Sequence, residues 1–256
     1  MRDAPIGFFD SGVGGLSVLR CAIDVMPEEK YIYFGDSAHA PYGVRSKEEV
    51  LALTLQAADR LMQQKIKALV VACNTATSIA VETLRKALPI PVISMEPAIK
   101  PALERTEGKI LLMATCVTLE SERVNALIRK LDTQSRIIKV PCPRLAEEIE
   151  KEAFGHSDLE EYLKEVLQDF RSCDAAAVVL GCTHYSFISE RIRRLLGEKV
   201  WIFDGIDGTV AHLRELLIQK GIKRDHKEKG SVSVQSSKKD DKTLALYHKL
   251  LSGGML

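Results

Sequence analysis

Short runs of apolar residues recur along the chain, separated by segments in which apolar residues lie three or four positions apart. Continuous apolar runs of this length are typical of parallel strands buried on both faces, and the longer spacing is typical of amphipathic helices. The eight predicted strands begin near Ile6, Tyr31, Ala68, Ile90, Ile110, Ile137, Ala176 and Val200. This regular alternation of strand and helix predicts an α/β protein with parallel sheets.

The first four runs and the last four are similarly spaced, with an offset of 104 to 110 residues between each run and its counterpart. The offset favours two similar α/β halves over the alternative, an ordinary α/β chain whose strands are evenly spaced. The tail beyond Lys223 begins as a charged loop, and we expect a further strand at 231–237 and a helix at Thr243–Leu251 that pack back on one half. Predicted capping boxes at two helix starts consist of Ser46 with Glu49 and Ser157 with Glu160.

Composition and charge narrow the class of protein. The 256 residues carry 36 Lys and Arg against 35 Asp and Glu, and this net charge of +1 argues against a nucleic-acid partner. The longest apolar runs, such as Ala175–Leu180, are too short to span a bilayer, and the N-terminus does not resemble a signal peptide. The six cysteines form no CxxC pair, which argues against a disulfide framework or a structural zinc site. We therefore expect a soluble cytoplasmic protein with reduced thiols.

Candidate chemistry follows the predicted strands, because ligands of open α/β sheets bind at the carboxyl ends of the strands. The segments at these ends are 10–15 (DSGVGG), 35–37 (GDS), 73–75 (CNT) and 181–184 (GCTH). The glycine loop at 12–15 precedes a predicted helix, so its backbone amides can receive an anion, and a small carboxylate fits it better than a nucleotide. The alternative for this loop is a tight strand-to-helix turn.

Two cysteines occupy equivalent positions in the two predicted halves. Cys73 and Cys182 lie 109 residues apart, and each follows a buried strand and has a threonine within two residues. A single cysteine is more often an inert apolar residue, but two in matched positions indicate a shared function. At a helix N-terminus the pKa of a thiol falls, so we expect an available thiolate. If the halves face each other, the two sulfur atoms approach one ligand from opposite sides.

Opposed thiols suit one reaction class, the inversion of a stereocentre through its C–H bond. A base removes the proton from one face while an acid delivers a proton to the other, and a thiol can serve in either role. Asp10 beside the first cysteine and His184 beside the second are the candidate partners, although His184 is equally explained as a hydrogen-bonded structural residue. Cys182 and His184 alone do not make a metal site, and no lysine lies in a recognisable pyridoxal-phosphate setting. We therefore expect no metal and no cofactor.

Weaker candidates lie near other strand ends. Asp36 and Glu150 are carboxylates that also fit a helix cap or a surface charge. The segment Pro41, Tyr42 and Gly43 predicts a turn, whose phenol or backbone amides are in reach of a ligand.

Five segments, in order FFDSGVGGLSVL, YFGDSAHAPYG, VVACNTATS, SMEP and VLGCTHYSFI, resemble the glutamate racemases of the cofactor-independent aspartate/glutamate racemase superfamily. The resemblance covers roughly residues 6–210. It implies two similar parallel-sheet α/β domains with a pseudo-twofold relation and an active site in the cleft between them. The expected domains are residues 1–97 with 207–256, and residues 98–206.

The resemblance also implies roles for particular residues. Cys73 and Cys182 are implied as the acid/base pair, assisted by Asp10 and His184, with Cys182 as the base in the L-to-D direction. The implied substrate contacts are Asp10, Ser11, Tyr42, Gly43, Asn74, Thr75, Thr183 and His184. The implied auxiliary residues are Asp36, Thr115 and Glu150. This chain departs from the family pattern at Ala114, Val124, Ser186 and residues 145–150.

The implied activity is the interconversion of L- and D-glutamate, with D-glutamate supplied to peptidoglycan synthesis in a bacterial cytoplasm. The implied partners are the small-molecule substrate and a second copy of the chain in a homodimer, with no nucleic acid and no membrane. The alternatives are an aspartate or hydantoin racemase of the same superfamily and a non-catalytic D-glutamate-binding protein.

Overall fold

The computed structural model describes residues 1–132, 135–156, 158–171 and 173–253. Its strands form two sheets in which every pairing is parallel. The five-stranded first sheet has the order β4-β3-β1-β2-β9, with β1 (Ile6–Asp10), β2 (Tyr31–Gly35), β3 (Ala68–Val71), β4 (Val92–Ser94) and β9 (Val232–Ser236). The four-stranded second sheet has the order β6-β5-β7-β8, with β5 (Ile110–Ala114), β6 (Ile137–Pro141), β7 (Ala177–Leu180) and β8 (Trp201–Phe203). The α/β class predicted from the spacing of the apolar runs is confirmed.

The two halves repeat one topology. Strands β2-β1-β3-β4 of the first sheet follow the same order as β6-β5-β7-β8 of the second sheet. The registers match as well: Ile6 pairs with Tyr31 and Ala68, and its counterpart Ile110 pairs with Ile137 and Ala177. The predicted repeat is therefore confirmed, and β9 is an addition to the first sheet only.

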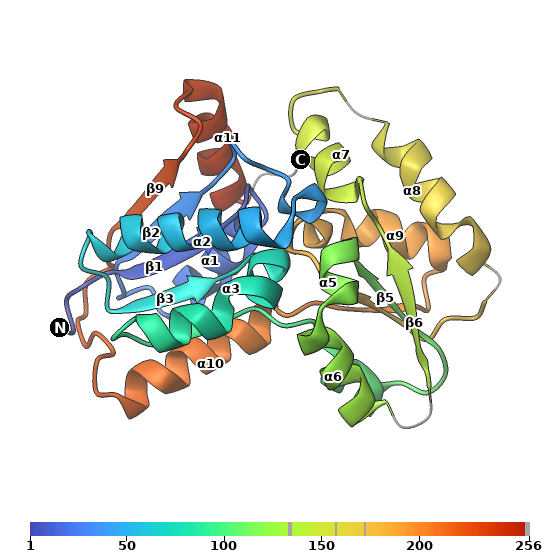
Figure 1. The fold of residues 1–256 in the computed structure, drawn as a ribbon, viewed down its shortest axis with the longest axis horizontal. Coiled ribbons are helices and arrows are strands. Elements are labelled where there is room, and N and C mark those ends of the chain that lie inside the picture. The colour runs from blue at the N-terminus through green and yellow to red at the C-terminus, as the bar shows by residue number, and fades with distance from the viewer. Residues whose placement is uncertain (133–134, 157, 172, 254–256) are drawn as a thin grey trace.

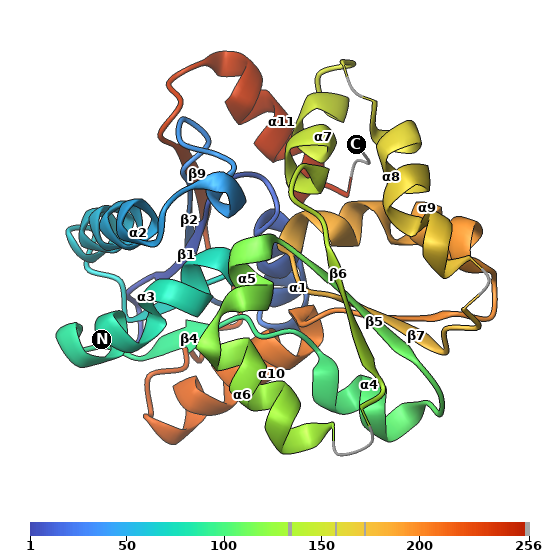
Figure 2. The same cartoon turned by 45° about the vertical axis from the view of Figure 1, so that its right-hand side comes forward.

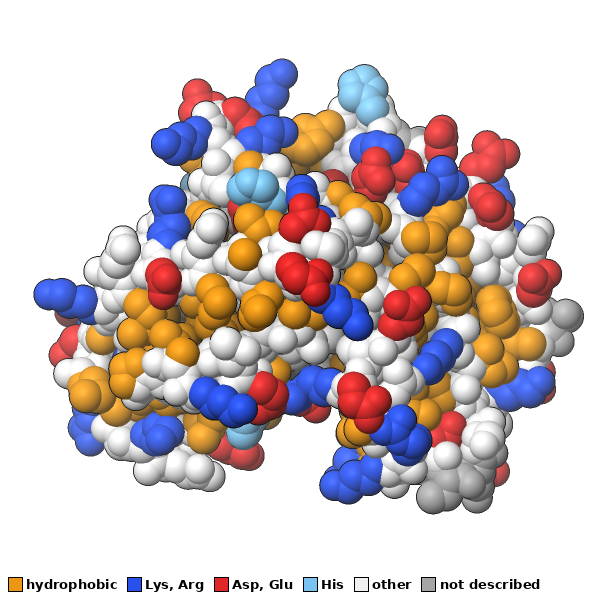
Figure 3. All heavy atoms as spheres, in the orientation of Figure 1, with side chains coloured by type: hydrophobic (Ala, Val, Ile, Leu, Met, Phe, Trp, Pro, Cys, Tyr) orange, Lys and Arg blue, Asp and Glu red, His pale blue; other side chains and the backbone are white. Residues whose placement is uncertain are grey.

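Helices lie around each sheet (Figure 1). The helices of the first half are α1 (Leu16–Val25), α2 (Lys47–Met62), α3 (Asn74–Ala87), α10 (Ile206–Gln219), α11 (Asp241–Leu251) and the short 3-10 helix η1 (Tyr42–Val44). Those of the second half are α4 (Ile99–Arg105), α5 (Cys116–Glu120), α6 (Glu122–Leu131), α7 (Leu145–Glu152), α8 (Leu159–Leu167), α9 (Ser189–Leu196), η2 (Gln168–Phe170) and η3 (Thr183–Ile188). The halves lie side by side, and the molecular outline is notched at the lower edge between them (Figure 3).

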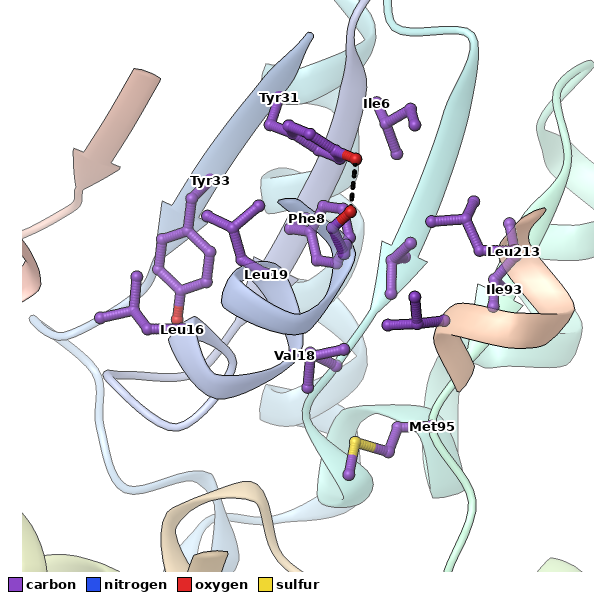
Figure 4. Packing of buried hydrophobic residues seen from close by; sticks show 14 of the residues in the cluster. Ile6, Phe8, Leu16, Val18, Leu19, Tyr31, Tyr33, Ile93, Met95 and Leu213 are labelled. Atoms are coloured by element: carbon purple, nitrogen blue, oxygen red, sulfur yellow. Dashed lines mark hydrogen bonds between the residues drawn. The ribbon is translucent and has the colours of Figure 1, made fainter. Parts of the chain in front are cut away.

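Both faces of the first sheet are buried, as continuous apolar strands require. Successive side chains of a strand point to opposite faces, so Phe8 packs with Leu19 and Tyr31 in one cluster while Phe9 joins Val71 in another. Figure 4 shows the first of these clusters between β1, β2 and helix α1. The second sheet likewise has a hydrophobic cluster on each face. This burial fixes the register of the strands and hence the position of their carboxyl ends.

The tail returns to the first half, as Figures 1 and 2 show. The predicted strand and helix are confirmed as β9, which pairs with β2, and α11. Tyr247 of α11 is buried and its hydroxyl lies 2.6 Å from Ser37 Oγ. At the opposite end of the sheet, the buried carboxylate of Glu29 accepts from Lys67 Nζ at 2.5 Å and from the backbone amide of Arg224 in the tail at 2.7 Å. The tail is thus bonded to the body of the first half at two places.

Several further predictions can be compared with the structure. The capping box of Ser46 and Glu49 at the start of α2 is confirmed, whereas the one predicted at Ser157 lies outside the described residues. All six cysteines are free thiols. Within the ranges that the structure describes, no helix combines the length and apolar character needed to cross a bilayer.

Candidate active site

The two matched cysteines lie at equivalent ends of equivalent strands. Cys73 follows β3 and forms the N-cap of α3, and Cys182 follows β7 and forms the N-cap of η3. Both are nearly buried, with exposed fractions of 5% and 8%. They are close enough for negative charge on Cys182 to raise the pKa of Cys73. The structure therefore brings the two thiols into one site, as the matched positions predicted.

Asp10, the last residue of β1, connects the two halves at this site. Its carboxylate is fully buried and accepts hydrogen bonds from the Gly12 backbone amide at 2.9 Å and from Thr183 Oγ1 at 3.1 Å. Ser11, the next residue, places its hydroxyl 3.3 Å from Cys73 Sγ. Burial raises the pKa of Asp10, while the charge on His184 and these two hydrogen bonds oppose the rise.

A chain of polar contacts leads away from Cys182. Its sulfur lies 3.8 Å from His184 Nδ1, and His184 Nε2 lies 2.8 Å from Glu150 Oε1 of α7. Burial alone favours neutral imidazole, but the hydrogen bonds and charges of Cys182 and Glu150 outweigh it and raise the pKa of His184 well above its ordinary value. His184 thus lies between the thiol group of Cys182 and the carboxylate of Glu150.

Cys73 has a different environment from Cys182. Burial, followed by the negative charge of Asp10, raises the pKa of Cys73 to about 12, and the donors Ser11 Oγ and the Ala76 amide only partly oppose this. The expectation that the start of a helix lowers the pKa of this thiol is therefore wrong for Cys73. Desolvation favours the neutral form, and it outweighs the single amide hydrogen bond, 3.5 Å long, at the start of α3.

The glycine loop allows the two halves to approach closely. A β-carbon at Gly14 would overlap Thr183 Oγ1 and lie 2.7 Å from His184 Nδ1. A β-carbon at Gly12 would overlap Glu150 Oε1. The Gly12 amide is already bonded to Asp10, and Gly15 leads into α1. The loop is thus a strand-to-helix turn, and its lack of side chains admits the residues around Cys182.

Asp36 and Tyr42 form a buried pair beside the first cysteine. Tyr42 donates its hydroxyl hydrogen to Asp36 Oδ2 at 2.7 Å, and Asp36 Oδ1 lies 2.8 Å from Nδ1 of His39. Burial and the hydrogen bond to Asp36 raise the pKa of Tyr42. Asp36 is therefore neither a helix cap nor a surface charge. His39 was missed by the sequence reasoning, because a histidine three residues after an aspartate in a loop has no distinctive pattern.

Hydroxyl groups join the halves at a second point. Thr75 Oγ1 of α3 lies 3.0 Å from Thr115 Oγ1, which donates to Thr118 Oγ1 at 3.0 Å. A β-carbon on Gly43 would lie 2.7 Å from Thr115 Cγ2, so η1 also packs closely here. Thr118 was not among the expected site residues, since a threonine in a helix gives no sequence signal of its own.

Asn74 carries an unused polar group at this site. Its side chain is 3% exposed, and neither Oδ1 nor Nδ2 has a hydrogen-bond partner among the described residues. A buried amide left unpaired costs about 1–3 kcal/mol, so its retention here points to a ligand. The site as a whole holds one neutral thiol, one thiol beside a cationic imidazole, and an amide available to a bound molecule. Across the same described ranges, no three His, Cys, Asp or Glu side chains are grouped to hold a metal ion.

The Asp/Glu/Hydantoin racemase family profile matches residues 17–215. A glutamate racemase from Clostridium acetobutylicum is 46% identical over 253 residues, which cover 98% of both chains. The crystal structure of a glutamate racemase isoform from Bacillus anthracis superposes with a TM-score of 0.86 at 31% identity, covering 100% of this chain and 96% of that one. The structure of the Francisella tularensis glutamate racemase in complex with D-glutamate gives a TM-score of 0.85 at 28% identity, with 100% and 96% coverage.

Proposed function

The chain belongs to the Asp/Glu/Hydantoin racemase family, and from this premise we propose that it interconverts L- and D-glutamate using two cysteine thiols. The single observation that supports the mechanism most is the unequal environment of the two matched cysteines. Cys73 is held as a neutral thiol by burial and by Asp10, while Cys182 lies beside His184, whose pKa is raised. A two-base racemase needs such a pair, one acid and one base at the same moment.

The chemistry follows from these states. In the L-to-D direction the Cys182 thiolate removes the α-proton, and the electron pair of the C–H bond remains on the α-carbon. The S–H bond of Cys73 breaks as its proton is delivered to the opposite face of that carbon. The enzyme is left with a thiol at Cys182 and a thiolate at Cys73, which is the starting state for the reverse direction. Ser11 Oγ and the Ala76 amide are placed to donate hydrogen bonds to the Cys73 thiolate.

The remaining polar groups of the site are the proposed substrate contacts. At the contact between the halves, the Thr183 hydroxyl donates to the Asp10 carboxylate, and both oxygens keep acceptor capacity for a donor group of the substrate. The unpaired amide of Asn74 can bind a carboxylate or an ammonium group of the substrate. The full proposed set is Asp10, Ser11, Tyr42, Gly43, Asn74, Thr75, Thr183 and His184, with Asp36, Thr115 and Glu150 as supporting residues.

Racemisation of purified D-glutamate, followed by circular dichroism without added cofactor, tests this function. We expect optical activity to decay to zero and the α-hydrogen to exchange in deuterated water. Faster turnover of aspartate or of a hydantoin would assign the chain to another activity of the family. Binding of D-glutamate without any exchange of the α-hydrogen would instead identify a binding protein.

We also infer a domain division at residues 1–97 with 207–256, and 98–206. Supporting it, α10 packs with α1 and β4 of the first half, and its Val210 and Leu213 belong to the same hydrophobic cluster as Phe8. The stretch 98–206 holds every strand of the second sheet. Expression of residues 98–206 alone as a cooperatively folding unit is the expected result, and an unfolded fragment would contradict the division.

From the family resemblance alone we propose that the enzyme acts in the bacterial cytoplasm as a homodimer and supplies D-glutamate for peptidoglycan. Light scattering on the purified chain measures its oligomeric state directly. Rescue of a D-glutamate auxotroph tests the supply of the product in the cell.

A further inference from the structure

A pocket lies between α3 and α6, and one of its lining residues, Asn74, directly follows Cys73 in the chain. Its volume is about 250 Å³. Helix α3 contributes Asn74, Thr77 and Ser78, which are on one face of the helix because they are three and four positions apart. The other walls are Met95, Glu96 and Pro97 after β4, and Arg123, Val124, Ala126, Leu127 and Lys130 of α6.

Unpaired polar atoms are concentrated in this pocket. The buried side-chain atoms without a hydrogen-bond partner, over the part of the chain described, are Thr54 Oγ1, Asn74 Nδ2, Asn74 Oδ1 and Arg123 Nε. Three of these four belong to residues that line the pocket. Arg123 is otherwise held in place, since its two terminal nitrogens bind Glu82 and Glu96. Two of the residues that line the pocket, Asn74 and Arg123, therefore carry buried polar atoms without a partner.

We propose that this pocket is a binding site for a small planar aromatic carboxamide, which pairs with the amide of Asn74 and thereby competes with the substrate for it. The effect on the substrate rests on the proposed function, whereas the binding itself does not. A carboxamide carbonyl accepts from Asn74 Nδ2, and its N–H donates to Asn74 Oδ1.

The rest of the pocket selects the body of the ligand. The side chains of Met95, Val124 and Leu127 form an apolar wall that a flat ring covers without leaving polar groups unpaired. Met95 also belongs to the first-half core, where Figure 4 shows it at the end of the cluster nearest the loop after β4. Arg123 is already paired with the carboxylates of Glu82 and Glu96, so an uncharged ligand leaves these two ion pairs in place.

Asn74 connects this pocket to the reaction. It follows Cys73 directly in the chain, and its one carboxamide cannot serve a ligand in the pocket and a substrate at the thiols with the same atoms. We therefore expect benzamide to raise the KM for glutamate about fivefold or more with little change in kcat, and glutamate to weaken benzamide binding by the same factor.

The test uses benzamide and N,N-dimethylbenzamide as probes, with binding followed by saturation-transfer NMR on the full-length chain. Benzamide is expected to bind and the dimethyl compound to bind at least about tenfold more weakly, because it has no N–H for Asn74 Oδ1. Ala126→Phe, which fills the rim of the pocket, should abolish binding. Ala52→Phe, on an exposed part of α2 away from the pocket, is the matched control and should retain it.

Equal binding of both probes would overturn the pairing with Asn74. The site would be overturned if benzamide did not bind, or if it still bound to folded Ala126→Phe and Val124→Phe variants. A benzamide-soaked crystal with only ordered water in the pocket would also overturn it. The probe comparison needs no variant, so a variant that fails to fold leaves the test intact. Because NMR binding is independent of turnover, loss of the proposed racemase activity is distinguishable from failure of this site.

Discussion

Gly12 of the first half and Glu150 of the second half are in such close contact that position 12 has no room for a β-carbon. An added methyl group would overlap Glu150 Oε1 and lie 3.2 Å from His184 Nε2. Since Glu150 is the partner that holds His184 beside Cys182, the missing side chain at Gly12 allows the histidine to be placed and charged there.

Gly12→Ala is therefore expected to displace the Glu150 carboxylate, which is the end of a flexible side chain, while leaving the fold intact. We expect kcat to fall about tenfold or more, because small displacements of catalytic groups are costly. Gly208→Ala in α10 is the matched control, since a β-carbon there meets nothing within 4 Å. It should keep full activity and gain about 0.5–1 kcal/mol of stability as a helical alanine. Equal activity of both variants would show that catalysis does not depend on the missing side chain at Gly12.

The single variants Cys73→Ser and Cys182→Ser should each lose racemisation by about 10²-fold or more while remaining folded, since removing one acid/base group has this effect. Each should still exchange the α-hydrogen of one glutamate enantiomer, the one whose α-hydrogen faces the remaining thiol. Proton NMR of both enantiomers in deuterated water measures this. Cys173→Ser, at a partly buried position outside the site, is the control. Full racemisation by either active-site variant would contradict the two-base scheme.

Glu150→Gln should move the pH dependence of the enzyme. The wild-type pKa of His184 is raised by Cys182 and Glu150 against the effect of burial, so loss of the carboxylate lowers it. The alkaline limb in the pH profile of kcat/KM should then shift to lower pH, because His184 loses its proton at a lower pH. Glu147→Gln, on the same helix and paired with Lys151 at the surface, should leave the limb unchanged.

The same variant gives a stability test with a defined sign. A histidine whose folded pKa is raised contributes stability that is fully present below its unfolded pKa, about 6.5, and that disappears as pH rises through the folded pKa. The wild type should therefore exceed Glu150→Gln in unfolding free energy most clearly in mildly acidic solution. Chemical denaturation at a series of pH values measures the difference, and a gap that widens with rising pH would contradict the assignment.

Tyr42→Phe should destabilise the protein by about 1–3 kcal/mol, since it leaves a buried oxygen of Asp36 without its donor. Thermal unfolding measures the loss. In a double-mutant cycle, Tyr42→Phe in an Asp36→Asn background should cost less than Tyr42→Phe alone. Strict additivity of the two changes would show that the hydrogen bond contributes nothing.

Lys67→Met should reduce stability by about 3–5 kcal/mol, because it leaves the buried Glu29 carboxylate without its cation. The double variant with Glu29→Leu should recover part of this loss, although the Arg224 amide then loses its acceptor. Urea unfolding, followed by far-UV circular dichroism, compares the stability of the single variant with that of the double variant. A double variant less stable than Lys67→Met would contradict the charge argument.

The strands were predictable because each is a separate apolar run with buried faces. Seven of the eight predicted starts fall within one residue of the structure, and β4 begins at Val92 rather than Ile90. Pairing across long stretches of chain left no local signal: nothing in the segment at 231–237 specifies that β9 lies beside β2. Periodicity reports which face of an element is buried, but not which element covers it.

The candidate site was predictable where two strand ends carried matching residues, as at Cys73 and Cys182. The electrostatics of the site were not predictable, since the pKa of Cys73 depends on burial by segments distant in the sequence. The role of Gly12 and Gly14 could not be predicted either. Glycine is favoured both in a tight turn and where two halves of a protein approach closely, so its presence does not distinguish the two. His39 and Thr118 became visible only when their partners Asp36 and Thr115 were placed beside them.

The position of β9 has a consequence for biosynthesis. All strands of the second sheet have been synthesised once translation reaches Phe203, whereas the edge of the first sheet is completed only by a segment at 232–236. During translation the middle of the polypeptide can thus finish its sheet while β2 still exposes an unpaired edge. A nascent chain stalled shortly before Val232 is the species most exposed to strand exchange with its neighbours, and so the one for which a chaperone matters most.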